Sequence, residues 1–239
     1  MSPSRRVALI AGLWFAGTFV FSIPAGLLYG PVLNDVGYVL GAGADARITL
    51  GALLEVLLAV SGIATAVVFY PVLKRQSESL ALGYFAARTV ESIIILIGVV
   101  ALLSVVTLRQ DIGGAGAPDP AMLEIAGRSL VAFHEWTRLL GPQFCAGVGN
   151  GIVLGSLLYA SGLVPRRMVW LGLVGGPLAV AGGIGVLVGA FEARSAPLVL
   201  LTALEFLWEA SLTIWLIVKG FSPSPIAAAY DRAAGHETV

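Results

Sequence analysis

The run ITLGALLEVLLAVSGIATAVVFY, residues 48–70, decides the class of fold, because Glu55 is its only charged side chain. A helix needs about 20 predominantly apolar residues to cross the hydrocarbon core of a bilayer. The run is too long for a strand of a membrane barrel, and it does not alternate between apolar and polar residues. It therefore predicts a transmembrane helix.

The composition of the whole chain agrees with a membrane protein. Of 239 residues, 58% are apolar or aromatic and only 12% are charged, against about 25% charged residues in an ordinary soluble domain. The lipid bilayer is the expected partner, and the 14 basic and 14 acidic residues leave no basic surface for nucleic acid. We predict an all-α, polytopic transmembrane bundle of about six spans, at residues 7–29, 48–70, 80–108, 142–161, 168–189 and 197–218.

The segment between the third and fourth spans has a different character. A glycine-rich connector, GGAGAPDP at residues 113–120, leads into an amphipathic helix at about residues 120–140, with Asp119 as its N-cap and Pro120 at its first position. This helix is too charged to span, so we place it at the outer interface, and Gly141-Pro142 is expected to end it. Residues 1–220 then form one membrane domain, and residues 221–239 are expected to be a disordered cytoplasmic tail.

Lysine and arginine residues predict the orientation, because short cytoplasmic loops collect them. The loops opposite the N-terminus hold only Arg47, Arg109 and Arg194. We therefore predict a multi-pass protein of the inner (plasma) membrane with both termini in the cytoplasm. The basic residues on the side of the N-terminus are Arg5, Arg6, Lys74, Arg75, Arg166, Arg167, Lys219 and Arg232.

Five ionisable residues inside the spans are the candidate functional residues: Glu55, Arg88, Glu91, Glu205 and Glu209. Each charge costs about 2.5 to 3.5 kcal/mol at the centre of a membrane helix, so these groups must be paired, protonated or hydrated. Arg88 can neutralise only one carboxylate. Because like charges cannot all ionise in a medium of low dielectric constant, we expect at least one of the four carboxyl groups to be protonated.

Helical spacing adds candidate ligand-binding residues. Tyr84 shares a face with Arg88 and Glu91, and Asn150 lies on a glycine-rich face of the fourth span. Trp208 and Trp215 lie beside the acidic face of the sixth span, where an indole can stack on a cation or a flat lipophilic ligand.

No metal or cofactor site is expected. Cys145 is the single cysteine, so a cysteine cage cannot form. His134 and Glu135 have no third ligand at a suitable spacing.

Three functions remain open, and the chain can be an enzyme or a transporter. In the first, Glu205, Glu209, Glu91 or Glu55 acts as a general acid on a lipophilic small molecule, for example in isomerising or cyclising a prenyl or terpenoid substrate. In the second, the chain is a proton- or cation-coupled transporter of a small molecule, with two inverted three-span halves. In the third, it is a non-catalytic sensor or assembly factor whose carboxyl groups only hold helices together. A homo-oligomer is compatible with each.

Three stretches resemble a known family: LALGYFAARTVE at residues 80–91, YASGLVP at 159–165 and WEASLTIWLIVKG at 208–220. They are similar to the bacterial membrane proteins grouped as domain of unknown function 4386, and the resemblance extends from the first span to Gly220. It implies a helical membrane fold and no particular activity. The residues of this chain that match the family pattern are Arg88, Glu91, Pro165, Glu209 and Lys219.

Overall fold

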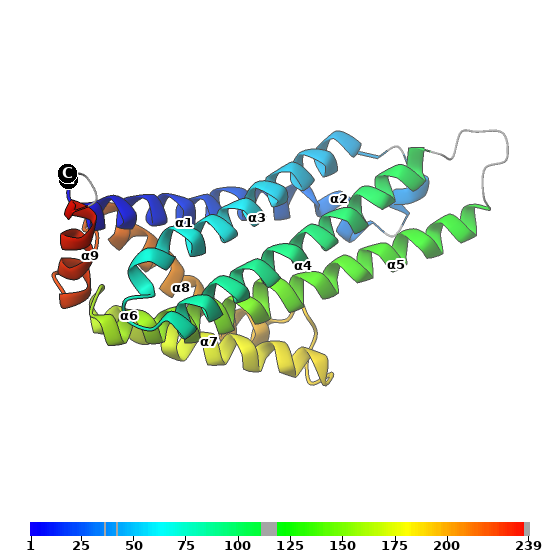
Figure 1. Ribbon diagram of the computed structural model, residues 1–239. Helices are drawn as coiled ribbons and strands as arrows, with labels where there is room; N and C mark the ends of the chain where they lie inside the picture. Colours follow the sequence, from blue (N-terminus) through cyan, green and yellow to red (C-terminus); the bar gives the residue numbers. More distant parts are fainter. Residues whose placement is uncertain (36, 42, 111–118, 237–239) are drawn as a thin grey trace.

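The computed structural model describes residues 1–35, 37–41, 43–110 and 119–236, and all the regular elements within them are helical (Figure 1). Residues 111–118, which hold most of the expected glycine-rich connector, lie outside the described residues. In chain order the elements are α1 (Pro3–Leu28), α2 (Gly30–Asn34), the 3₁₀ turn η1 (Tyr38–Leu40), α3 (Asp45–Leu73), α4 (Glu78–Gln110), α5 (Pro120–Arg138), the π-helical segments η3 (Leu139–Cys145) and η4 (Gly147–Leu154), α6 (Gly155–Ser161), α7 (Arg166–Leu187), α8 (Ala196–Val218) and α9 (Pro225–His236).

Six helices of the described chain are long and apolar enough to cross a membrane. Five are α1, α3, α4, α7 and α8, and the sixth is the continuous helix Pro120–Ser161, which joins α5, η3, η4 and α6. The predicted all-α fold with six spans is therefore confirmed, and the chain is a multi-pass membrane protein.

The fourth span differs from the expected arrangement, because the helix does not end at Gly141-Pro142. Asp119 caps α5 as predicted, accepting the Ala121 N–H at 2.8 Å, but the helix then continues through Pro142 in π-helical turns. Proline lacks the N–H of an α-helical hydrogen bond and clashes with the preceding turn. A π-helical turn is wider, which explains how the helix passes this proline without a break.

α5 also does not lie flat as a separate interfacial helix. It packs along α4, with Leu123, Gly127, His134 and Thr137 buried, and it projects beyond the ends of α7 and α8 (Figure 1). The continuous helix has 42 residues, so at about 1.5 Å per residue it is about twice as long as the roughly 30 Å hydrocarbon core is thick.

Close helix contacts at glycine residues hold the second half of the bundle together. α7 packs against α8 and η4, and an added Cβ atom at Gly151 would fall only 2.6 Å from Glu205 Oε2 and also against Gly176 Cα. Small residues let membrane helices approach this closely. The glycines that the sequence places in these helices thus bring the backbone of η4 into contact with α7 and with the acidic face of α8.

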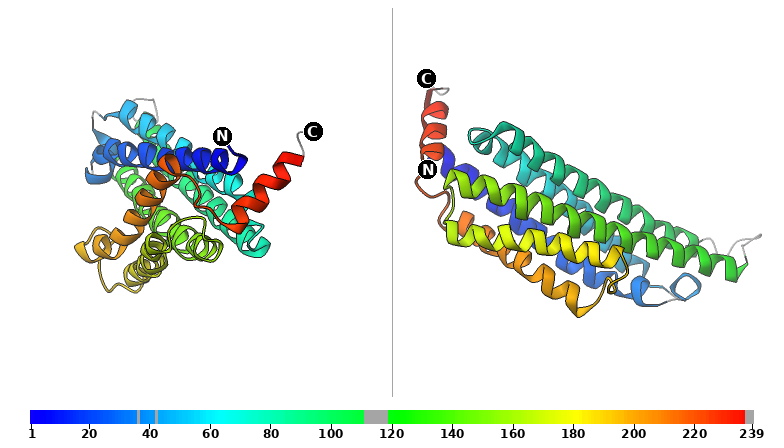
Figure 2. Two further views of the ribbon diagram at one scale, coloured as in Figure 1. Left: turned by 90° about the vertical axis from the view of Figure 1, so that its left-hand side faces the viewer. Right: turned by 90° about the horizontal axis from the view of Figure 1, so that it is seen from below.

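The C-terminal tail differs from the expected disordered chain. Helix α9 covers the end of the bundle at which both termini lie (Figure 2). The Asp231 carboxylate accepts hydrogen bonds from the backbone N–H and the hydroxyl of Ser4, at 2.7 and 2.8 Å. Ala227 is buried in the core, and Ile226 and Tyr230 pack against it. This short apolar face is enough to dock the tail, which sequence reasoning took to have nothing to bury.

Candidate functional site

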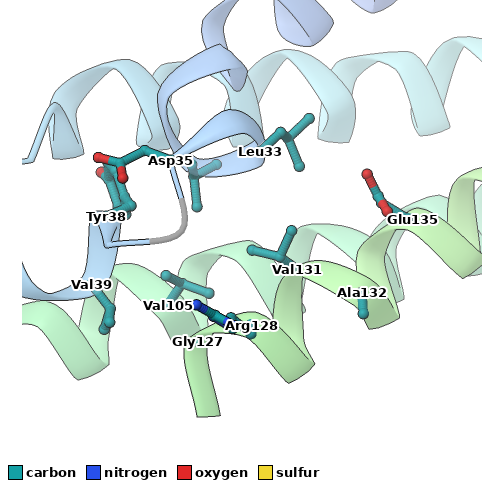
Figure 3. A pocket seen from close by; sticks show the side chains of 11 residues that line it. Leu33, Asp35, Tyr38, Val39, Val105, Gly127, Arg128, Val131, Ala132 and Glu135 are labelled. Carbon is teal, nitrogen blue, oxygen red and sulfur yellow. The ribbon is translucent and has the colours of Figure 1, made fainter. Parts of the chain in front are cut away.

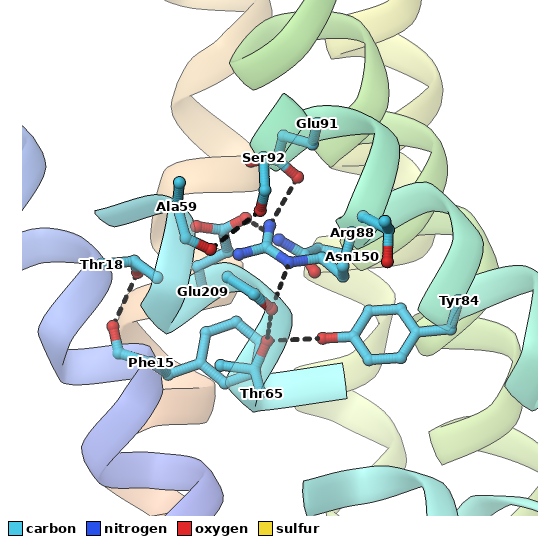
Figure 4. A network of polar contacts seen from close by, with 12 residues as sticks. Phe15, Thr18, Ala59, Thr65, Tyr84, Arg88, Glu91, Ser92, Asn150 and Glu209 are labelled. Carbon is cyan, nitrogen blue, oxygen red and sulfur yellow. Dashed lines mark hydrogen bonds and ion pairs between the residues drawn. The ribbon is translucent and has the colours of Figure 1, made fainter. Parts of the chain in front are cut away.

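The centre of the site is an ion pair on α4. Arg88 and Glu91 are 3% and 6% exposed, and 2.6 Å separates Arg88 Nη1 from Glu91 Oε2 (Figure 4). Their three-residue spacing puts both side chains on one helix face. The sequence left open which carboxylate pairs with Arg88. In the structure the partner is Glu91, on the same helix.

Helix α3 forms the opposite wall with backbone carbonyl groups. Arg88 Nε donates to Gly62 O at 3.4 Å, and Ser92 Oγ donates to Ala59 O at 3.0 Å. An added Cβ atom at Gly62 would lie 3.0 Å from Arg88 Nη2, so the missing side chain makes room for the guanidinium.

The same interface continues one turn further at Tyr84. Its hydroxyl lies 3.4 Å from Thr65 Oγ1, which in turn donates to Gly62 O at 2.6 Å. The polar contacts of α4 thus recur every four residues, at Tyr84, Arg88 and Ser92. They form a polar seam between α3 and α4, in an otherwise apolar bundle (Figure 4).

The other half of the bundle contributes Asn150 and Glu209. Asn150 Nδ2 donates to Glu209 Oε1 at 2.5 Å, and Trp208 Nε1 donates to the Asn150 carbonyl oxygen at 3.0 Å. Glu209 and Arg88 both belong to the network of polar side chains in Figure 4. The structure thus brings Arg88, Glu91, Asn150 and Glu209 together from α4, η4 and α8.

Glu205 lies one turn from Glu209 and is the least satisfied polar group of the site. It is 4% exposed, and neither carboxyl oxygen has a hydrogen-bond partner among the described residues. The side-chain oxygen of Asn150 is also buried and unpartnered within them. Buried polar side-chain atoms are rarely left without a partner, so three unpaired acceptor oxygens in neighbouring residues require an explanation.

Glu55 belongs to a second polar group, nearer the end of the bundle that lies away from the termini. Its Oε2 accepts the Tyr29 hydroxyl at 3.0 Å, and a cavity of about 10 Å³ lies between Glu55, Ile95, His134, Thr137, Arg138 and Pro142. A cavity of this size holds about one water molecule. Within the described residues, Glu55 has no hydrogen bond to the central site, which α3 reaches two turns further on, at Gly62.

Sequence reasoning missed His134 as a member of this second group. His134 is 3% exposed, its Nδ1 lies 3.1 Å from Gly98 O, and its ring contacts that of Tyr29 with centroids 5.5 Å apart. The signal was present, because Leu123, Gly127, His134 and Thr137 recur at helical spacing. The charged residues on the opposite face of α5 instead led to the prediction that this helix lies at the membrane interface.

The two predicted tryptophans have different surroundings. Trp208 is fully buried, and its indole N–H lies against Gly172, where an added Cβ atom would be 2.6 Å from Nε1. Trp215 is half-buried, with a buried Nε1 that has no partner among the described residues. Within the part of the chain that the structure describes, no three His, Cys, Asp or Glu side chains are grouped to hold a metal ion.

A pocket of about 210 Å³ lies away from the central site, between α2, η1, α4 and α5. Neither this pocket nor the small cavity beside Glu55 is lined by Arg88, Glu205 or Glu209. Arg88, Glu91, Asn150 and Glu205 are buried among the packed helices.

Six apolar helices around a buried ion pair and two further carboxyl groups define a multi-pass membrane protein with a charged interior. The chain belongs to the family described as domain of unknown function (DUF4386), whose model matches residues 10–220. The match includes the central site and confirms the resemblance of the sequence. Comparison with curated proteins finds no match, and neither does comparison with solved structures.

Proposed function

We propose that the chain is a proton-coupled carrier of a small lipophilic molecule, in which Glu205 and Glu209 bind and release the proton. The observation that carries this proposal is the buried Glu205 carboxyl group, whose two oxygens have no hydrogen-bond partner among the described residues. A proton on this group removes a charge that would otherwise be uncompensated in the membrane interior.

Glu205 suits proton exchange better than Glu91 does. The Glu91 carboxylate is held by Arg88 at 2.6 Å, and such a pair is neutral without a proton. Glu205 and Glu209 lie one turn apart on α8, where two negative charges would repel one another. Ionisation of one therefore opposes ionisation of the other, so the protonation of the two carboxyl groups is coupled.

Arg88 supplies a way to couple the proton to movement. Its guanidinium is bonded to Glu91 on its own helix, and Glu209 on α8 belongs to the same polar network (Figure 4). If Glu209 releases a proton, its charge competes for Arg88 and draws α4 and α8 together. Protonation of Glu209 removes this attraction. Pairing of Arg88 with Glu91 alone, or with Glu209 as well, can therefore favour two different arrangements of the helices.

A second candidate function is general-acid catalysis on a lipophilic substrate, such as isomerisation or cyclisation of a prenyl or terpenoid chain. One observation favours it, the fully buried Trp208 three residues from Glu205, since an aromatic face stabilises a developing cation. It requires a substrate cavity at Glu205 and Trp208, whereas the 210 Å³ pocket and the small cavity beside Glu55 are not lined by these residues. Tyr84 and Trp215 would be substrate contacts of such a cavity, and Glu55 would be a separate candidate acid.

Infrared spectroscopy of the protein in liposomes tests proton binding directly. We expect the wild-type spectrum to contain the carbonyl band of a protonated carboxyl group at neutral pH, and this band to weaken in Glu205→Gln. Glu78→Gln, which changes an exposed carboxylate at the start of α4, is the matched control and should leave the band unchanged. An identical band in wild type and Glu205→Gln would refute proton binding at Glu205.

Transport and catalysis are separated by a second measurement. Proteoliposomes on a solid-supported membrane are exposed to a panel of lipophilic amines, acids and alcohols with and without a pH gradient. A current that depends on the gradient and disappears in Glu205→Gln and Glu209→Gln supports coupled transport. Chemical conversion of a panel member without any current would support catalysis instead.

A further inference from the structure

The 210 Å³ pocket lies at the end of the bundle away from the termini (Figures 1 and 3). One wall is formed by α2 and η1, and the other by α4 and α5. Gly127 lets the walls meet closely, because an added Cβ atom there would lie 3.3 Å from Val39 Cβ. Most of the lining is aliphatic, from Val32, Leu33, Val39, Val105, Val131 and Ala132.

Three charged side chains also line this pocket, and two of them are already neutralised. Arg128 pairs with Glu124 and Glu135 pairs with Arg194, each at 2.6 Å. The Asp35 carboxylate accepts the Gly37 N–H, at 2.9 Å, and has no ion pair within the described residues. Asp35 is therefore the charged lining residue that has no ion-pair partner in the part of the chain that the structure describes.

Tyr38 also lines the pocket, three residues after Asp35 (Figure 3). The tyrosine hydroxyl donates to Asp45 at 3.1 Å. Burial, together with this hydrogen bond and the nearby Asp45 charge, raises the pKa of Tyr38 to about 12. The Tyr38 ring is buried and already has the Arg109 guanidinium 5.9 Å from its centroid, so it closes one side of the pocket as a wall.

We propose that this pocket binds a small lipophilic amine, with the ammonium group at Asp35 and the hydrocarbon part between the aliphatic walls. A carboxylate at the edge of an apolar pocket attracts an organic cation through its charge. The pocket is smaller than the roughly 300 to 1,000 Å³ of sites for drug-sized ligands, so the ligand is short. Amine binding here requires no proton exchange at Glu205.

Calorimetric titration of the full chain in lipid nanodiscs tests the proposal with n-hexylamine, n-hexanol and n-hexanoate, and empty nanodiscs correct for partition into lipid. We expect the amine to bind more tightly than the alcohol, and the acid to bind least. Affinity should rise about fourfold for each methylene between n-butylamine and n-hexylamine, which corresponds to about 0.8 kcal/mol per buried methylene.

Two substitutions separate the charge from the cavity. Asp35→Asn should weaken amine binding roughly two- to fivefold, the range expected for an exposed ion pair, and leave hexanol binding unchanged. Ala132→Phe fills the pocket and should abolish binding of both. Glu192→Gln, an exposed carboxylate between α7 and α8 outside the pocket, is the matched control. Equal binding of amine, alcohol and acid, or unaltered binding in Ala132→Phe, would overturn the proposal.

Discussion

The Arg88 guanidinium pairs with Glu91 on its own helix, and Glu209 on α8 belongs to the same polar network (Figure 4). Removing one partner of a buried ion pair leaves the other charge uncompensated, whereas replacing both by apolar residues of similar size is often neutral. The stability of the protein therefore depends less on any one of Arg88, Glu91 and Glu209 than on whether their charges compensate one another.

Substitution at the ion pair tests this balance. We expect Arg88→Met to lower the free energy of unfolding by about 3 to 5 kcal/mol, because Glu91 loses its partner. The double variant Arg88→Met/Glu91→Leu should recover most of this loss. Reversible unfolding in detergent micelles measures both, and a double variant as unstable as the single one would contradict the expectation.

Glu205 and Glu209 should respond differently to the same change. Glu205→Leu should alter the free energy of unfolding by less than about 1 kcal/mol or increase it, because no hydrogen bond among the described residues is lost. Glu209→Leu should cost about 1.5 to 3 kcal/mol, because the 2.5 Å bond from Asn150 is lost. A large loss in Glu205→Leu would mean that this carboxyl group is structural, as a sensor or assembly factor would require.

At the scale of the elements, the π-helical segments position the site. η4 carries Asn150 toward Glu209, and its glycines press its backbone against α7 and α8. π-Helical turns occur frequently at functional sites. Here the turn directs the Asn150 amide toward Glu209 on α8. The next residue, Gly151, has no side chain, so the backbone of η4 lies close to α7 and α8.

Gly151→Ala tests the close contact between these elements. The added methyl group would meet Gly176 Cα and lie 2.6 Å from Glu205 Oε2, so we expect a loss of about 1 to 3 kcal/mol in the free energy of unfolding. Gly26→Ala in α1 is the matched control, because an added Cβ atom there has nothing within 4 Å. It should be neutral or stabilising by up to about 1 kcal/mol, from helix propensity. Equal effects of the two substitutions would show that the contact is loose.

The whole molecule is asymmetric along the membrane normal. α3, α4 and α5 extend past the ends of α7 and α8, and the long helix Pro120–Ser161 begins at the far end from the termini (Figures 1 and 2). The proposed amine site lies in this extension, whereas the central carboxyl groups lie within the six-helix part. The distribution of Lys and Arg predicts that the extension faces away from the cytoplasm.

Cysteine labelling tests the orientation, with Cys145→Ser as the background. A membrane-impermeant maleimide should label Ala121→Cys in intact cells, and label Ser79→Cys only after permeabilisation, because these exposed positions lie at opposite ends of the bundle. The reverse pattern would invert the predicted topology. Labelling of both in intact cells would contradict a single orientation.

The apolar runs were sufficient to predict six membrane helices, because a bilayer requires every span to be long, apolar and internally hydrogen-bonded. Local spacing likewise predicted that Arg88 and Glu91 share a helix face and that Asp119 caps α5. These features depend on residues close together in the chain. The continuity of the helix through Pro142 and the docking of α9 were missed, since both depend on packing against distant segments.

The meeting of Glu209 with Asn150, the isolation of Glu205 and the separate position of Glu55 could not be derived from spacing. Helical periodicity orients a side chain around its own axis, but it leaves open how far neighbouring helices slide or rotate against one another. In this bundle that choice is made by contacts between glycine backbones of η4 and α7 and by the Trp208 hydrogen bond across to η4. Those long-range contacts leave Glu91 in an ion pair, Glu55 and Glu209 hydrogen-bonded, and Glu205 without a partner among the described residues.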